Sequence, residues 1–321
     1  MDSLKFAFDT LIVGALALPW LALFVRMYFV QSATADSRLA IVSALPEHTR
    51  EAVASVLIVA LGYFLGAAAT RISNNFFNDE LWFALPTESS IRASVYDREY
   101  CNVHSALKSY NVNLPLVLGH AAAAETAVCT AVGEVRRHVV TELFRIQEGR
   151  LLLAGEDKLA RLKEFHDQII ILRGSALNGT ALAVLSLFGL CACYRARFSD
   201  RLRRAISYLP ALALLGYGLF SLYRHFADYH PRAAHGFPYE DPPLAELVLI
   251  LFAICGFLVC RRTSKEDLRV YRNTWILAVV LTLIAHGAWW WTEVLYNEQV
   301  IHSSLHVPAA RPAADRPNSE S

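Results

Sequence analysis

The sequence predicts an all-α protein: a six-span transmembrane helical bundle with a helical extramembrane domain between spans 2 and 3. Three observations lead to this fold class. Six long apolar runs are spread along the chain, and a polar segment of about 105 residues separates the second run from the third. Hydrophobic residues make up 55% of the chain and charged residues 18%, with a mean hydropathy of +0.33. That composition is too apolar for one soluble domain of 321 residues.

Each apolar run approaches the thickness of a bilayer. A run of about 17–21 residues, at a helical rise of about 1.5 Å per residue, nearly spans a hydrocarbon core of about 30 Å. Backbone amides find no water in lipid, so such runs must be helical. The six runs are Thr10–Val30, Val53–Thr70, Ala176–Tyr194, Ala205–Tyr223, Leu244–Cys260 and Thr274–Thr292.

These runs divide the chain into four parts. Residues 1–70 form two N-terminal transmembrane helices, and residues 71–175 form the helical extramembrane domain. Residues 176–298 form a four-helix transmembrane bundle. Residues 299–321 are rich in Pro, Ala, Ser and Arg, a composition typical of a disordered tail.

Two helices are predicted within the extramembrane domain. The first extends from Gly119 to Leu153, because apolar residues recur there at the helical spacing: Val128, Val132, Val135, Val139, Leu143 and Ile146. The second begins near Glu156, after Gly155, and continues through Arg173 into the third span. One helix would therefore connect the extramembrane domain to the bundle.

Positive charge predicts the orientation in the membrane. Two short loops each carry five basic residues, and such loops stay in the cytoplasm: Arg195, Arg197, Arg201, Arg203 and Arg204 in one, and Arg261, Arg262, Lys265, Arg269 and Arg272 in the other. Both termini and the 71–175 domain would then be external. The preference for arginine in these loops suggests a cell membrane location, specifically a bacterial inner membrane.

The six cysteines do not follow the spacing of a zinc site, which needs CxxC-like pairs in a loop. Four of them fall in the apolar runs, where small buried residues are expected. Cys101 and Cys129 fall in the polar segment. If that segment is external, the two can form a disulfide, because the compartment is oxidising.

The strongest ligand or proton-site candidates are His225, Glu246 and His286, near the outer ends of spans 4–6. Residues 224–235 are expected to form an external loop. An ionisable residue within a span is costly and usually faces protein or a water-filled cavity. Glu246 and His286 could exchange protons, or His225 and His286 could bind haem or a metal. The alternative is that His286 bonds a backbone carbonyl and Glu246 reaches water.

Three further patterns have a structural and a functional interpretation. Glu134, His138 and Glu142 share one helical face, which suits a metal or a solvated charged surface with neighbouring arginines. Trp289–Trp291 is typical of an aromatic belt at the headgroups. Gly62 and Gly66 allow close helix packing, either within the bundle or in a homo-oligomer.

The sequence predicts a membrane protein without naming its reaction. A net charge of +1 gives no basic surface for nucleic acid, and no phosphate loop, nucleophile elbow or HExxH motif occurs. We expect a non-enzymatic, membrane-anchored interaction, sensing or effector module, with the lipid bilayer and a protein partner of the 71–175 domain as its contacts. The alternative is a small transporter or membrane enzyme that uses the Glu/His site.

Overall fold

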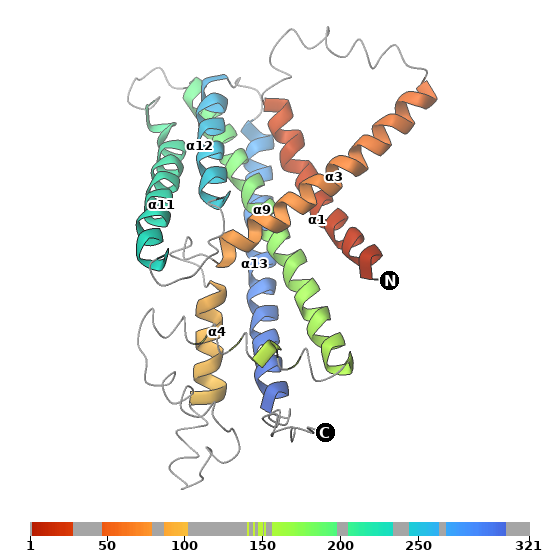
Figure 1. Ribbon diagram of the computed structural model, residues 1–321. Coiled ribbons are helices and arrows are strands. Elements are labelled where there is room, and N and C mark those ends of the chain that lie inside the picture. Colours follow the sequence, from red (N-terminus) through yellow and green to blue (C-terminus); the bar gives the residue numbers. More distant parts are fainter. Residues whose placement is uncertain are drawn as a thin grey trace, which may run out of the picture. The chain divides into compact units, whose positions relative to one another are not determined.

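The computed structural model describes residues 2–27, 47–78, 87–101, 140, 144, 147–149, 151, 156–197, 205–233, 244–262 and 268–305 (Figure 1). Nearly all of these residues (98%) are helical and none of them forms a strand, which confirms the all-α class. The chain divides into two compact units. Unit 1 comprises Met1–Phe83 and Ile170–Trp289, and unit 2 comprises Ala84–Ile169 and Trp290–Ser321.

Four helices belong wholly to unit 1, and two further helices contribute residues to both units. The unit 1 helices are α1 (Asp2–Val25), α3 (Glu47–Asn78), α11 (Leu209–Ala233) and α12 (Leu244–Arg262). The shared helices are α9 (Glu156–Arg197) and α13 (Leu268–Leu305). Unit 2 adds α4 (Glu88–Tyr96) and the π-helical segment η3 (Asp97–Cys101).

Four of these helices are long and apolar enough to cross a membrane: α1, α3, α9 and α13. Helix α12 is apolar over a shorter stretch, Ala245–Cys260. Helix α11 falls short because the polar residues Arg224, His225 and Asp228 occupy its second half. All six predicted runs therefore contain helix, whereas four of them meet the length and composition of a span.

The predicted connection between the extramembrane segment and the third span is confirmed, because α9 is one unbroken helix of 42 residues. Gly174 and Gly179 do not interrupt it. Each lies where another helix approaches closely: a Cβ at Gly174 would come within 2.6 Å of a Val13 methyl, and one at Gly179 within 2.5 Å of the Thr282 hydroxyl. The two glycines therefore permit packing rather than bending.

Helices α1 and α3 cross with their backbones in contact. A Cβ at Gly14 would collide with the carbonyl oxygen of Gly62, and a Cβ at Gly66 would collide with that of Thr10. Small residues at such crossings let two helices approach in the way that membrane helices commonly do. Helix α1 of the same chain thus covers Gly62 and Gly66, as expected for packing within the bundle, and a homo-oligomer contact stays a prediction.

A buried asparagine joins α9 to α1. The Asn178 amide donates to the Val13 carbonyl at 2.8 Å, and its oxygen accepts from the Trp20 indole at 3.1 Å. Asn178 is 3% exposed, so these bonds replace those it would make with water. Polar pairing of this kind fixes which faces of two apolar helices meet, because a slip of either helix would leave a buried amide unsatisfied.

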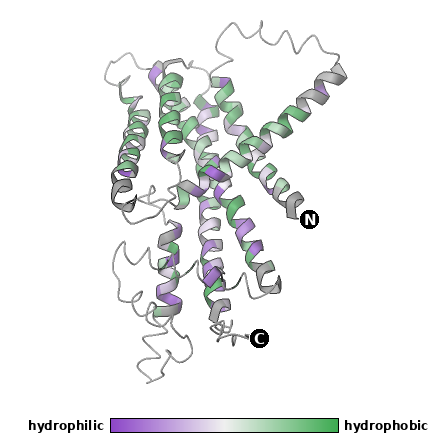
Figure 2. Ribbon diagram, in the orientation of Figure 1, coloured by the Kyte–Doolittle hydropathy of each residue, from purple (hydrophilic) through white to green (hydrophobic). Residues whose placement is uncertain are grey.

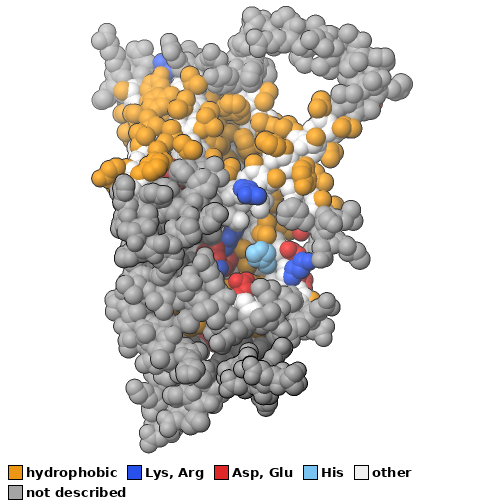
Figure 3. Space-filling model, viewed as in Figure 1, with side chains coloured by type: hydrophobic (Ala, Val, Ile, Leu, Met, Phe, Trp, Pro, Cys, Tyr) orange, Lys and Arg blue, Asp and Glu red, His pale blue; other side chains and the backbone are white. Residues whose placement is uncertain are grey.

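Apolar side chains cover the described surface of unit 1. Leu57 and Phe64 on α3 are 62% and 68% exposed, and Leu283 on α13 is 63% exposed. Figure 2 shows the hydrophobic character of α1, α3, α11 and α12, and Figure 3 shows the apolar surface over α11 and α12. Water would penalise so much exposed apolar area, whereas lipid would not.

Helix α4 of unit 2 has a regular N-terminal cap. Thr87 adopts an extended conformation, and its hydroxyl accepts from the Ser90 backbone N–H at 3.4 Å. The carboxylate of Glu88 in the first turn interacts favourably with the positive end of the helix dipole. The core of unit 2 combines α4 with α9, α13 and residues of the 140–151 stretch, and its buried members include Val95, Tyr96, Val140, Phe144, Leu151, Leu162, Val300 and Ile301.

Two boundaries differ from those predicted. The expected external loop at 224–235 is wrong for residues 224–233, because α11 continues to Ala233. Neither Gly nor Pro occurs between Tyr223 and Pro231, so nothing in that stretch ends the helix. Helix α13 continues to Leu305, past the predicted last run Thr274–Thr292 and into the first residues of the predicted tail at 299–321. The apolar stripe of the predicted 119–153 helix lies outside the described residues.

Candidate functional site: a buried polar cluster in unit 2

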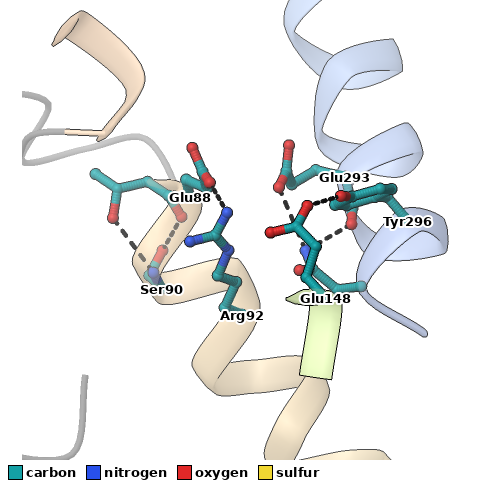
Figure 4. Close-up of polar contacts among 8 residues, drawn as sticks. Glu88, Ser90, Arg92, Glu148, Glu293 and Tyr296 are labelled. Atoms are coloured by element: carbon teal, nitrogen blue, oxygen red, sulfur yellow. Dashed lines mark hydrogen bonds and ion pairs between the residues drawn. The ribbon is translucent and has the colours of Figure 1, made fainter. Parts of the chain in front are cut away.

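Unit 2 buries a group of charged and polar side chains, which we call the polar cluster: Glu88, Arg92, Glu148, Glu293, Tyr296 and Asn297. Figure 4 shows that the Glu88 and Arg92 side chains of α4 point toward Glu293 and Tyr296 of α13, with Glu148 beside them. The electrostatic influence of Glu148, Glu293 and Arg92 on the Tyr296 hydroxyl places all four in one environment.

Helix α4 contributes an ion pair. Glu88 and Arg92 are four residues apart, so they lie on one helical face, and Arg92 Nη2 contacts Glu88 Oε1. The Arg92 guanidinium also lies over the Phe144 ring, 4.6 Å from its centroid. Its side chain is 16% exposed. Ion pairing and the aromatic face together compensate the desolvation of this charge.

Helix α13 contributes a carboxylate and an amide one turn apart. Glu293 is 1% exposed and Asn297 is fully buried. The Asn297 amide nitrogen donates to the Glu293 backbone carbonyl at 2.6 Å and lies 3.4 Å from the Glu293 carboxylate. Because this nitrogen faces two oxygens, the orientation of the Asn297 amide is fixed: a flipped amide would set oxygen against oxygen.

Tyr296 connects α13 to the 147–149 segment. Its hydroxyl donates a hydrogen bond to the half-buried Glu148 carboxylate. Its ring packs against Phe144, with the centroids 5.9 Å apart. Residues distant in sequence are therefore brought together by one aromatic side chain that has an apolar ring and a polar tip.

A second group of charges connects η3 to the end of α13 at the surface of unit 2. Arg98 pairs with Glu298 and, at 2.7 Å, with Glu99. The other carboxylate oxygen of Glu99 lies 3.3 Å from His302 Nε2. The Arg98 and His302 side chains are 55% and 59% exposed. Water screens such pairs, so each contributes on the order of 1 kcal/mol or less.

The predicted site residues His225, Glu246 and His286 all belong to unit 1. Glu246 is buried in the first turn of α12, where its carboxylate acts electrostatically on the Tyr217 hydroxyl of α11. His286 lies against Phe77 and Trp289, with ring centroids 5.8 and 5.0 Å away. The side chain of His225 lies outside the described residues. A shared Glu246–His286 site stays a prediction, as does haem or metal binding by His225 and His286.

The three consecutive tryptophans have different surroundings, and the aromatic belt stays a prediction for the two that are exposed. Trp290 and Trp291 are 41% and 58% exposed. Trp289 is fully buried: it packs on Phe77 at 4.6 Å, and the Arg173 guanidinium lies 5.5 Å from its ring centroid.

The other predicted sites are only partly described. Glu134, His138 and Glu142 lie outside the described residues. Among the residues that the structure does describe, no group of three His, Cys, Asp or Glu side chains is arranged to hold a metal ion. Cys101 is disulfide-bonded, while Cys191, Cys193, Cys255 and Cys260 form no disulfide. The predicted partner of Cys101, Cys129, lies outside the described residues.

Comparison with known proteins gives no relative. The chain matches no family model, no curated protein and no solved structure at a significant level.

Proposed function

We propose that this chain is a six-span integral membrane protein in which unit 2 is an external, non-enzymatic interaction, sensing or effector module. The observation that carries the proposal is that α9 and α13 are unbroken helices with residues in both units. A change in unit 2 that displaces either helix would reach unit 1 without passing through a loop. Packed helices of this kind have few alternative arrangements, which is what a switch requires.

The two chain segments that make up unit 2 support an even number of membrane crossings in the part of the chain between α9 and α13. Unit 2 draws on both Ala84–Ile169 and Trp290–Ser321, and a compact unit of this kind would lie on one side of the membrane. If α9 and α13 each cross once, α11 and α12 must either both cross or both stay on one side. Leu219 of α11 and Leu251 of α12 are 52% and 57% exposed, similar to residues on the four longer candidates. Lipid contact by both helices, and therefore six spans, explains this exposure.

The disulfide at Cys101 supports an external position for unit 2. Disulfides persist in oxidising compartments and are rare in the cytoplasm. The four cysteines that form no disulfide all lie in helices of unit 1, where burial in the bundle or in lipid would protect their thiols from oxidation. This agrees with the positive-inside orientation, and the bacterial inner membrane remains part of the proposal.

Hydrogen exchange tests whether the shared helices transmit a change. Arg92→Met would loosen unit 2 without touching unit 1. We expect faster amide exchange in residues 176–190 of α9 and 274–288 of α13, both in unit 1. Helix α12, which has no residue in unit 2, is the internal control and should be unaffected.

Ile170→Pro adds a second control, because proline removes a helical hydrogen bond and clashes with the preceding turn. Combined with Arg92→Met, it should uncouple residues 176–190 of α9 while the response of α13 persists. Faster exchange confined to unit 2, or an equal response in α12, would remove the argument for transmission.

The second candidate, a small transporter or membrane enzyme, would use the surroundings of His286. One observation favours it: His286 Nε2 and Trp289 Nε1 are buried, and neither has a hydrogen-bond partner within the described part of the chain. A polar ligand could supply those partners, and so could buried water. This candidate places function in unit 1, and it predicts that activity survives the uncoupling of α9.

A further inference from the structure

We propose that the first half of α13 binds a phospholipid with an anionic head group. The lipid phosphate lies at two arginines in the first turns of the helix, and the acyl chains lie along the apolar residues that follow on the same face. We call this face the lipid stripe: Arg269, Arg272, Ile276, Val280 and Leu283. The inference rests on the proposed function in one respect, because it takes α13 to be a membrane span.

The lipid stripe is a single exposed face of a regular helix. Its members are separated by steps of 3, 4, 4 and 3 residues, so all of them lie within about a quarter of the helix circumference. Both arginines are exposed. The apolar members Ile276, Val280 and Leu283 are 50%, 47% and 63% exposed. One face therefore presents two cations at its start and a continuous apolar path after them.

The opposite face of α13 is packed against the rest of unit 1, so the lipid stripe cannot turn inward. Tyr271 and Ala278 are one and three turns into the helix on that opposite face, and they are 1% and 0% exposed. A Cβ at Gly189 of α9 would come within 2.6 Å of the Tyr271 ring and 2.5 Å of the Met27 methyl carbon. Contacts this close fix the rotation of α13 about its axis.

The end of unit 1 where α13 begins lacks negative charge. Arg26 precedes Met27 and Arg272 follows Tyr271, so the close approach of Met27 and Tyr271 brings both arginines to this end. No acidic side chain occurs among the described residues of the helix ends that meet there, which are 20–27, 185–197, 205–214, 252–262 and 268–275. A phosphate would supply the missing charge, and the arginine guanidinium pairs with phosphate through two N–H groups.

The length of the apolar path favours a phospholipid over a free phosphate. From Arg272 to Leu283 the helix rises about 16 Å, which is close to the roughly 15 Å of hydrocarbon in one leaflet. A free phosphate would engage the arginines alone, whereas a phospholipid engages the whole stripe. The proposed orientation also places this end of α13 at the cytoplasmic leaflet, where anionic lipids concentrate.

Native mass spectrometry of the full chain in detergent tests the proposal. The probes are phosphatidylglycerol and phosphatidylcholine with identical acyl chains, so that only the charge of the head group differs. We expect phosphatidylglycerol to bind at least about fivefold more tightly, since a basic residue near anionic lipid contributes about that factor. It should also raise the unfolding temperature. Inorganic phosphate should not displace it.

Three substitutions define the site. Arg272→Gln should weaken phosphatidylglycerol binding about fivefold, and the double variant Arg269→Gln/Arg272→Gln about twenty-five-fold. Arg272→Lys keeps the charge and should retain most of the binding. The matched control is Arg26→Gln, which removes one positive charge from an exposed residue at the same end of unit 1 but outside the lipid stripe. This control should weaken binding less than twofold.

Three outcomes would overturn the proposal. Equal binding of the two lipids would mean that the head-group charge is not recognised. Equal weakening by Arg26→Gln and Arg272→Gln would indicate general attraction to positive charge rather than a site on α13. Displacement of the lipid by inorganic phosphate would indicate a small-anion site. None of these measurements depends on the side of the membrane on which unit 2 lies or on hydrogen exchange, so the proposed function is tested separately.

Discussion

Arg92 and Arg98 lie six residues apart on neighbouring segments, yet their surroundings differ. Arg92 is largely buried between the Glu88 carboxylate and the Phe144 ring. Arg98 is 55% exposed, and the side chains of its partners Glu99 and Glu298 are partly exposed, at 22% and 26%. Removing one partner of a buried pair leaves an uncompensated charge, whereas water takes over when an exposed pair is broken.

The two arginines should therefore differ in their effect on stability. Arg92→Met keeps an apolar side chain beside Phe144 but leaves Glu88 without its cation. We expect the free energy of unfolding to fall by about 3–5 kcal/mol. Arg98→Met should lower it by no more than about 1 kcal/mol. Thermal unfolding of the purified variants in detergent measures both, and equal losses would contradict the assignment of Arg92 to a buried cluster.

The polar cluster could not be predicted from sequence for a physical reason. Glu88 and Arg92 have the spacing of an ordinary surface pair, and so do Glu293 and Asn297. Only folding brings Glu148 to Tyr296, 148 residues away. The one available signal is that Glu293 lies two residues after the last of three consecutive tryptophans, which places a charge close to aromatic side chains.

At the scale of elements, the glycines of α1 and α3 have a specific role. Gly14 and Gly66 lie where one helix backbone touches the other, and no side chain could move aside to admit a Cβ. Gly216 of α11 has open space around it. The same substitution should therefore have opposite consequences at the two kinds of position.

Gly66→Ala should destabilise the chain by about 1–3 kcal/mol, because its Cβ would strike the Thr10 carbonyl and push α1 away. Gly216→Ala is the matched control and should be neutral or stabilising by up to about 1 kcal/mol, since alanine favours helix. The unfolding temperatures of the two variants in detergent test this prediction. A Gly66→Ala variant as stable as Gly216→Ala would mean that α1 and α3 do not meet at these residues.

The elements were predictable where local signals are strong. The start of α9 at Glu156 follows from Gly155, and its continuity follows from the absence of proline up to Arg197. The end of α11 was not predictable from hydropathy, because residues 224–233 are polar and still helical. Hydropathy identifies the residues that suit an apolar environment, and a helix can continue beyond those residues.

At the scale of the whole molecule, the division of the chain was only partly visible in the sequence. The apolar runs predicted where apolar helices lie, but α13 extends well beyond its run and contributes Glu293, Tyr296 and Asn297 to unit 2. From sequence, a polar stretch after the last apolar run is most simply interpreted as a tail. The end of α13 is part of a folded unit instead, because it lies against α4 and the 147–149 segment. The polar cluster therefore combines residues from two distant parts of the sequence, 88–148 and 293–297.

The central claim is that the chain crosses the membrane six times with unit 2 outside. A dual reporter, active on one side only, can be fused after Arg150, Arg203, Phe237 and Lys265. The account predicts external, cytoplasmic, external and cytoplasmic signals, in that order. A cytoplasmic signal after Phe237 would reduce the count to four spans and leave unit 2 external. A cytoplasmic signal after Arg150 would contradict the account.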